Sequence, residues 1–159
     1  MPHKITIYTD GSARGNPGPG GYGVVLLSGN YRKELSQGFR HTTNNRMELL
    51  AVIVGLEALK YDFSDVTIYS DSKYVVEAIE KGWLNQWVQK RFNKTKNKDL
   101  WLRYLEISQK QNVRFIWIKG HAANVENECC DKLAVAASHF PDLLIDEWYE
   151  SQVTILKTE

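Results

Sequence analysis

Residues 42–60 read TTNNRMELLAVIVGLEALK, and this stretch decides the fold of the chain. Upstream of it, apolar and polar side chains alternate as they do in β-strands. From residue 45 to residue 60 the apolar side chains, which include Met47, Leu50 and Val54, follow the period of an α-helix. The polar residues 42–45 supply capping groups for the start of that helix. The chain therefore passes here from sheet to a helix that can cover the sheet.

Three strands are predicted before this helix, at Lys4–Thr9, Gly23–Leu27 and Tyr31–Phe39. The segment at residues 15–21, GNPGPGG, forces a turn after the first strand. A short connection at residues 28–30 joins the second strand to the third. The first part of the chain is therefore predicted to be an antiparallel meander with one face to cover.

After the helix, strand and helix patterns alternate. The predicted elements are a strand at Val66–Tyr69, helices at Lys73–Glu80, Trp83–Val88 and Leu100–Gln109, a strand at Val113–Ile118 and a helix at Val125–Ser138. This order predicts an α/β fold in which the meander is followed by right-handed crossovers, which place the first and fourth strands side by side and parallel. The 159 residues are expected to form one domain.

The last twenty residues, 140–159, are weakly patterned. Gln152–Leu156 has the composition of a marginal strand, and a loosely docked tail is the alternative.

The charge is unevenly distributed, although the formal net charge is only +1. Residues 81–98 contain six basic side chains and no acidic one. The rest of the chain carries 14 basic and 19 acidic residues. A basic segment on a mildly acidic body indicates a polyanionic partner that is contacted at one place, and a nucleic acid is the leading candidate. We call residues 81–98 the basic handle.

Nothing in the sequence predicts export or membrane insertion. The chain passes from Met1 directly into a strand pattern, without the basic and apolar regions of a signal peptide, and no apolar run approaches the ~20 residues that span a bilayer. The two cysteines, Cys129 and Cys130, are adjacent and offer neither a disulfide framework nor zinc-site spacing. A cytoplasmic protein is expected.

Four carboxylates lie where strands end or where helices run inward: Asp10, Glu48, Asp71 and Asp131. The first and third follow the two strands that should be parallel neighbours, and open α/β sheets place their sites at the carboxyl ends of such strands. Converging carboxylates repel one another, and divalent cations with oxygen ligands relieve that repulsion. The placement predicts a metal-dependent active site.

Each acid also has an ordinary structural explanation. Asp10 is compatible with a turn before Gly11, and Glu48 stands three residues after Asn45, as in a capping box. Asp71 is compatible with a helix N-cap, and Asp131 with a solvated helix face. Their joint occurrence around one sheet edge is what favours a common site.

Two further features bear on function. His121 follows a strand on a small-residue loop just before the last predicted helix, so it is either structural or a proton carrier beside the acids. In the basic handle, Trp83, Trp87 and Phe92 interleave with the cations. They either pack the handle to the body, which we expect for Trp87, or form a nucleic-acid groove with the cations.

Together these segments resemble type 1 ribonuclease H in its bacterial form. The likeness rests on YTDGS at residues 8–12, GNPGPGG at 15–21, TTNNRMEL at 42–49, DS at 71–72, KGHA at 119–122, NE at 127–128 and CD at 130–131. It covers residues 4 to about 138 and includes several motifs in the family's order and spacing.

The resemblance implies a ribonuclease H-like fold, with a mixed five-stranded sheet flanked by helices and a protruding basic handle. It also implies hydrolysis of the RNA strand of RNA–DNA hybrids. It implies that Asp10, Glu48, Asp71 and Asp131 hold two Mg²⁺ ions, with Mn²⁺ as a possible substitute, and that Asp10 bridges both ions. His121 is implied to move protons or to help release the product. The expected products carry 5′-phosphate and 3′-hydroxyl ends, and the expected state is a monomer.

The resemblance also implies contacts to both strands of the hybrid. Minor-groove contacts to the RNA and its 2′-hydroxyls are implied for Gly11, Asn16, Asn44 and Asn45. Contacts to the DNA strand are implied at a phosphate for Thr43 and Asn97, and at a deoxyribose for Trp83 and Phe92. The handle cations Lys90, Arg91 and Lys94 would attract the phosphate backbone.

Three departures from the family pattern concern substrate contacts and the catalytic loop. His41 stands where an arginine for a DNA phosphate is common, and Ser72 where a longer glutamine often follows the third acid. Residues 123–125, Ala-Asn-Val, replace the usual Gly-His-Pro. None of these departures removes one of the four acids.

Two other functions remain open at this point. A metal-dependent nuclease of the same fold could act on DNA. A non-catalytic module that binds hybrids is the second alternative.

Overall fold

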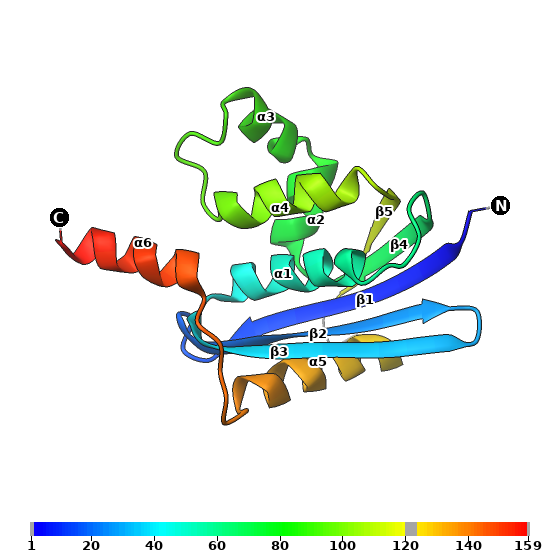
Figure 1. Cartoon of the computed structure of the whole chain (residues 1–159), viewed down its shortest axis with the longest axis horizontal. Helices are drawn as coiled ribbons and strands as arrows, with labels where there is room; N and C mark the ends of the chain where they lie inside the picture. The colour runs from blue at the N-terminus through cyan, green and yellow to red at the C-terminus, as the bar shows by residue number, and fades with distance from the viewer. Residues whose placement is uncertain (1, 120–123, 159) are drawn as a thin grey trace.

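A mixed five-stranded sheet forms the centre of the protein (Figure 1). The structure is a computed structural model that describes residues 2–119 and 124–158. The strands are β1 (Lys4–Ala13), β2 (Gly18–Ser28), β3 (Tyr31–Thr42), β4 (Asp65–Ser70) and β5 (Asn112–Trp117). The helices are α1 (Asn44–Glu57), α2 (Lys73–Glu80), α3 (Trp83–Gln89), α4 (Lys98–Ser108), α5 (Val125–Ser138) and α6 (Glu147–Thr158). The predicted fold class is confirmed.

The strands lie in the order β3-β2-β1-β4-β5. The pairs β1–β2 and β2–β3 are antiparallel and form the predicted meander, whereas β1–β4 and β4–β5 are parallel. In the parallel register Thr9 pairs with Ser70, so Asp10 and Asp71 follow paired positions. The carboxyl end of β4 therefore lies beside β1 at Thr9, and Asp10 and Asp71 come together as the sequence predicted, although β1 itself continues to Ala13.

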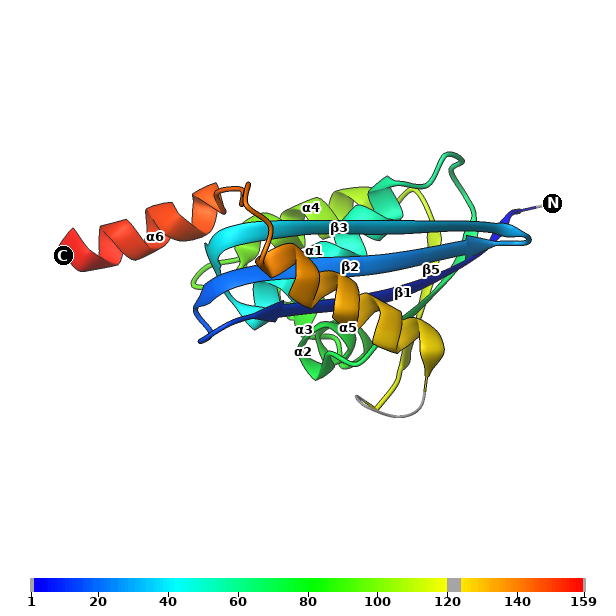
Figure 2. The same ribbon diagram turned by 90° about the horizontal axis from the view of Figure 1, so that it is seen from below.

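Helices cover both faces of the sheet. Helix α1 packs on β1 and β2 and carries α4 on its outer side, while α5 packs on the opposite face against β1, β2 and β3 (Figures 1 and 2). The core lies between the sheet and α1, where Ile7, Val24, Met47, Ile53 and Ile68 are fully buried. Within the described residues, no helix has both the length and the apolar character needed to cross a membrane.

The first three strands are longer than predicted. The β1–β2 ladder continues past Asp10, which pairs with Gly23, as far as Ala13 and Gly20. Glycines in this part of β2 weaken a strand prediction, but they let α5 approach closely. A Cβ at position 23 would lie 2.3 Å from the carbonyl oxygen of Cys130, so packing of the helix on the sheet explains why glycine stands in a strand here.

The C-terminal segment contradicts the predicted strand at Gln152–Leu156, because this segment belongs to helix α6. The strand propensity of the β-branched residues in this segment is overridden by tertiary context and by a favourable helix start. The backbone carbonyl of Asp146 accepts the first helical hydrogen bond, from the Glu150 amide, and the acids Glu147 and Glu150 lie in the first turn, where they complement the helix dipole.

Candidate active site

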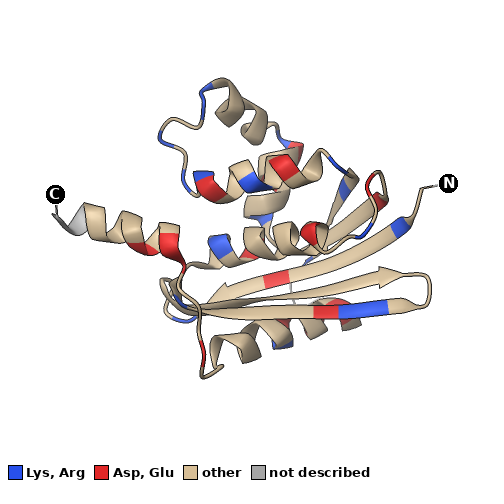
Figure 3. Ribbon diagram, in the orientation of Figure 1, with Lys and Arg blue, Asp and Glu red and all other residues tan. Residues whose placement is uncertain are grey.

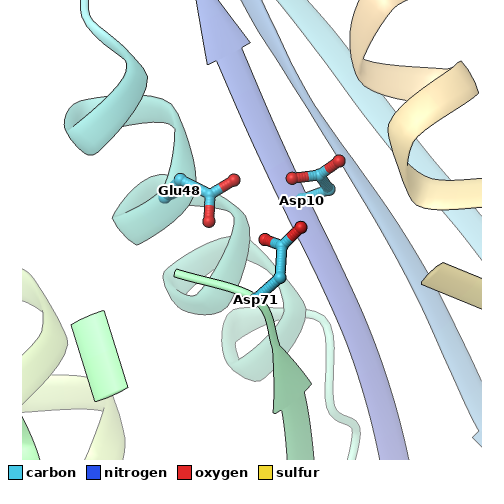
Figure 4. A group of neighbouring side chains, drawn as sticks. All are labelled: Asp10, Glu48 and Asp71. Atoms are coloured by element: carbon cyan, nitrogen blue, oxygen red, sulfur yellow. The ribbon is translucent and has the colours of Figure 1, made fainter. Parts of the chain in front are cut away.

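Three of the four predicted acids converge. Asp10 lies on β1, Asp71 follows β4, and Glu48 lies in the second turn of α1, and their carboxyl groups face one another (Figure 4). Each offers a ligand oxygen, and these oxygens lie within 4.8 Å of one another. Asp10 and Glu48 are only 7% and 8% exposed, while Asp71 is half-buried. This spacing lets a single cation contact all three carboxylates.

Gly11 joins two of these carboxylates. Its backbone N–H donates to Asp10 Oδ1 at 2.9 Å and to Glu48 Oε1 at 2.5 Å. A Cβ at this position would lie 2.3 Å from the backbone carbon of Met47, so only glycine allows α1 to approach β1 this closely. The Gly11 N–H, for which a substrate contact was implied, is thus used to orient the acids.

The ordinary structural explanations for these three acids do not hold. Asp10 lies within a continuing strand and not in a turn. The side chain that caps α1 is Thr43, which accepts from the Arg46 amide at 3.2 Å, so Glu48 is not the partner of a capping Asn45. Helix α2 is capped by Ser72, which follows Asp71.

Burial opposes the charge of this cluster. Burial raises the pKa of Asp10 to about 7, and the nearby charges of Asp71 and Asp131 act in the same direction. Burial also raises the pKa of Glu48 well above its ordinary value, with Asp10 and Asp71 adding to the effect. Near neutral pH the buried pair therefore retains a proton, which a divalent cation would displace.

Asp131 lies at the margin of the cluster. It is an exposed residue of α5 and does not belong to the three acids whose oxygens converge. Its charge nevertheless helps to raise the pKa of Asp10, so α5 presents this acid toward the same region. The close packing of α5 on Gly21 and Gly23 sets this position.

The predicted proton carrier His121 lies outside the described residues, as does Ala123. The next residue, Asn124, caps α5 by accepting from the amide of Asn127 at 2.9 Å, and Val125 begins that helix with an exposed side chain.

Three asparagines with implied RNA contacts lie together at the start of α1. Asn16 Oδ1 accepts from the Asn44 amide at 2.9 Å, and Asn44 Oδ1 accepts from the Ala13 amide at 2.6 Å. Asn45 is exposed. Since the side-chain oxygens of Asn16 and Asn44 fix the loop, their Nδ2 groups are the donors that these side chains can offer to a ligand.

Thr43 and Asn97 line one groove, as the implied phosphate contact requires. Asn97 adopts a left-handed backbone conformation with φ of 59° at the start of α4. Its Oδ1 accepts from Arg46 at 3.2 Å and its Nδ2 donates to the Tyr74 hydroxyl at 3.1 Å. The asparagine is therefore held in place from two sides.

The aromatic residues of the basic handle divide into two groups. Trp87 packs on the buried Trp101, with ring centroids 5.4 Å apart, as expected for a packing residue. Phe92 is also a core residue and is only 7% exposed, so little of its ring is left for the implied sugar contact. Trp83 is 37% exposed, with Lys81 above its ring.

The handle cations are accessible. Lys90, Arg91 and Lys94 are exposed, and basic residues mark the loop between α3 and α4 (Figure 3). Arg91 and Lys94 have positive φ values, so the loop turns tightly in this basic region.

Arg46 is a buried residue that the sequence reasoning missed. It is 2% exposed and bonds Asp146 through Nε at 2.7 Å and Asp99 through its terminal nitrogens at 2.8 and 2.7 Å. The signal was an arginine within the most apolar helix, where a cation requires buried partners. Arg46 thereby joins α1 to α4 and to the segment that leads into α6.

The sequence of the chain is similar to those of several proteins from bacteria. The RNase H family model matches residues 2–139. A ribonuclease H of Desulforamulus reducens is 57% identical over 148 residues, which cover 90% of this chain and 92% of that protein. A ribonuclease HI of Synechocystis sp. is 47% identical over 154 residues, or 93% of this chain and 96% of that protein.

Solved structures with the same fold include two RNase H1 proteins. LC9-RNase H1, a type 1 RNase H with the type 2 active-site motif, has a TM-score of 0.79 and 28% identity, and the match covers 87% of this chain and 73% of that one. LC11-RNase H1 in complex with an RNA/DNA hybrid has a TM-score of 0.63 and 29% identity over 84% of this chain and 95% of that one.

Proposed function

Because the chain belongs to the ribonuclease H family of endoribonucleases, we propose that it hydrolyses the RNA strand of RNA–DNA hybrids by a mechanism that uses two divalent metal ions. The observation that carries the proposal is the convergence of Asp10, Glu48 and Asp71 at the point where the parallel pairing of β1 with β4 ends. The products would carry 5′-phosphate and 3′-hydroxyl ends.

The chemistry of the acid cluster fits a hard divalent cation. Its ligands are carboxylate oxygens, which Mg²⁺ and Mn²⁺ prefer. Burial and the neighbouring carboxylates raise the pKa of Asp10 and of Glu48, and a bound divalent cation would offset both effects. Asp10, Glu48, Asp71 and Asp131 would hold the ions. When bound, such ions activate water and stabilise a leaving oxygen at a phosphodiester.

The residues of the chain itself would orient the reaction. Gly11 fixes the direction of the Asp10 and Glu48 oxygens through its N–H. His121, which precedes α5 in the sequence, would carry a proton to or from the reacting groups, because the ordinary pKa of histidine lies near working pH. This assignment rests on its place in the sequence motif.

Selectivity for a hybrid would arise because the protein contacts each strand with different chemistry. The amides of Asn16, Asn44 and Asn45 lie at the start of the helix that carries Glu48, where they would contact the RNA minor groove. Thr43 and Asn97 would hold a DNA phosphate, and the basic handle with Trp83 would follow the DNA backbone. The hybrid complex of LC11-RNase H1 supports this choice of substrate.

The proposal is tested with a panel of labelled duplexes in Mg²⁺: an RNA–DNA hybrid, duplex RNA and duplex DNA of the same sequence. We expect cleavage of the RNA strand of the hybrid and little of the others. Efficient cutting of duplex DNA would favour the alternative of a DNA nuclease with this fold.

The alternative of a non-catalytic hybrid-binding module is distinguished with Asp10→Asn. This change keeps the size of the side chain and removes a charge from the cluster. We expect hydrolysis to fall by at least about 100-fold while hybrid binding is kept, since a shared metal ligand contributes several kcal/mol to the transition state. Equal turnover by the wild type and the variant would rule out the assigned site.

A further inference from the structure

A groove of about 680 Å³ lies between the handle loop and α6. Within the described part of the chain, its lining contains the residues with implied phosphate contacts, Thr43 and Asn97, and three lysines but no acid. The lysines are Lys94, Lys96 and Lys98. Its other wall is formed by α6, through Trp148, Tyr149, Gln152 and Val153. The groove therefore continues from the proposed phosphate site onto a helix with no assigned role.

Helix α6 is held at its start by polar anchors, while its body packs little. Asp146 binds the buried Arg46 and accepts from the Thr42 hydroxyl at 2.7 Å, and Glu150 binds Arg40 through two oxygens. In both views the helix projects beyond the edge of the sheet (Figures 1 and 2). These anchors fix the direction of a helix that contributes little to the core.

The groove side of α6 carries aromatic and amide groups suited to a sugar–phosphate strand. The Trp148 ring lies 5.1 Å from the Arg46 guanidinium, which holds it in place. The Tyr149 ring lies 5.5 Å from His41, the residue that replaces the family's usual phosphate-binding arginine. The acids of α6, Glu147 and Glu150, are not part of the groove lining. Cations beside aromatic rings are the usual surface for a nucleic-acid backbone.

We propose that α6 forms a wall of an extended DNA-strand track, in which Tyr149 and Gln152 contact the backbone of the DNA strand beyond the phosphate held by Thr43 and Asn97. The inference rests on the proposed function, because it extends the path of the same hybrid. The aromatic side chains pack on sugars, Gln152 donates to a phosphate, and the three lysines neutralise the strand.

The test changes the charge of the groove at one residue. Gln152→Lys adds a cation to the wall and Gln152→Glu adds an anion, and Gln152 takes no part in the anchors of α6. The same pair of changes at Ser151, which is exposed and outside the lining, provides the matched control. We expect the KM for hybrid cleavage to fall about threefold with lysine and to rise about threefold with glutamate at position 152, with kcat unchanged.

A truncation series identifies the strand. When only the DNA strand is shortened past the phosphate site, the difference in KM between the Gln152→Lys and Gln152→Glu variants should vanish. When only the RNA strand is shortened, this difference in KM should persist. Equal effects at positions 151 and 152, or a difference that survives every DNA truncation, would overturn the inference. Failure of the proposed function would instead appear as absence of hybrid cleavage by the wild-type protein.

Discussion

Single residues set the chemistry of the acid cluster. Asp10 and Glu48 are drawn to one N–H because Gly11 has no side chain to hold α1 away from β1. The same proximity that makes the carboxylates repel one another makes them ready to share a cation. Burying these carboxylates together without a metal ion costs folding free energy, and this cost should be measurable as a dependence of stability on pH.

Without divalent metal, the protein should become less stable as pH rises from 5 to 8. Asp10 has a folded-state pKa of about 7 against an ordinary value of 3.8, so between these values the folded state keeps a proton that the unfolded state releases. The free energy of unfolding then falls with rising pH, by on the order of 2–3 kcal/mol. Urea denaturation in the presence of a chelator measures it.

The control is Asp10→Asn, which removes one member of the pair and should flatten this profile. Added Mg²⁺ should stabilise the wild type more at pH 8 than at pH 5.5, because binding at the lower pH must first displace protons. A wild-type profile as flat as that of the variant would count against the buried, uncompensated cluster.

Gly11→Ala should damage both stability and activity. The new Cβ would meet the backbone of Met47 at 2.3 Å, and backbone cannot move aside as a flexible side chain does. We expect a loss of about 3 kcal/mol or more in the free energy of unfolding, and weaker Mg²⁺ binding by calorimetry. Gly29→Ala is the control, because no atom lies within 4 Å of its Cβ and only its φ of +57° opposes alanine. Equal losses for both variants would mean that the contact with α1 is unimportant.

At the scale of elements, α1 connects the acids to the outer parts of the molecule. Glu48 on this helix joins the cluster, while Arg46, two residues earlier, binds Asp99 of α4 and Asp146 before α6. The direction of α6 and the position of the handle loop therefore depend on the helix that carries a proposed metal ligand.

Arg46→Met should destabilise the protein by about 3–5 kcal/mol, because it leaves Asp99 and Asp146 without their cation in a buried setting. Thermal or urea unfolding monitored by circular dichroism measures the loss. The matched control is Arg40→Met, which removes the more exposed pair with Glu150 and should cost no more than about 1 kcal/mol. Similar costs for the two variants would show that Arg46 is not the structural link described.

The basic handle should act through electrostatics. Replacing Lys90, Arg91 and Lys94 together by glutamine should weaken hybrid binding and reduce the slope of log K against log salt by up to about 3. Hybrid binding by the Asp10→Asn protein, measured over a range of salt concentrations, gives this slope. The same replacement of the exposed Lys4, Lys33 and Lys110 is the control. If both triple variants have the wild-type slope, the handle cations do not contact the phosphates of the hybrid.

At the scale of the whole molecule, the sequence predicted the sheet and the placement of four acids around one of its edges, and three of these acids converge. Period-two alternation located the meander, and the change of period at residues 42–60 located α1. The parallel pairing of β1 with β4 then followed from connection rules, and it brings Asp10 and Asp71 together. These features depend on local pattern and topology, which a single sequence records.

The features that the sequence did not predict depend on contacts between distant segments. Residues 18–21 were predicted to belong to a turn, but they form the start of β2, and α5 packs closely on Gly21. Residues 152–156 were predicted as a strand from their local strand propensity. The direction of α6 is instead set by the ion pair between Arg46 and Asp146, which are one hundred residues apart in the sequence. The contact of His41 with Tyr149 belongs to the same class.

The most direct test of the central claim is analysis of the product ends from a hybrid with labelled RNA, incubated with the wild type or Asp10→Asn, with Mg²⁺ or with a chelator. We predict RNA fragments with 5′-phosphate and 3′-hydroxyl ends only for the wild type with Mg²⁺. RNA cleavage that persists in the chelator, or that is as fast with Asp10→Asn, would contradict a metal-dependent active site built on Asp10, Glu48 and Asp71.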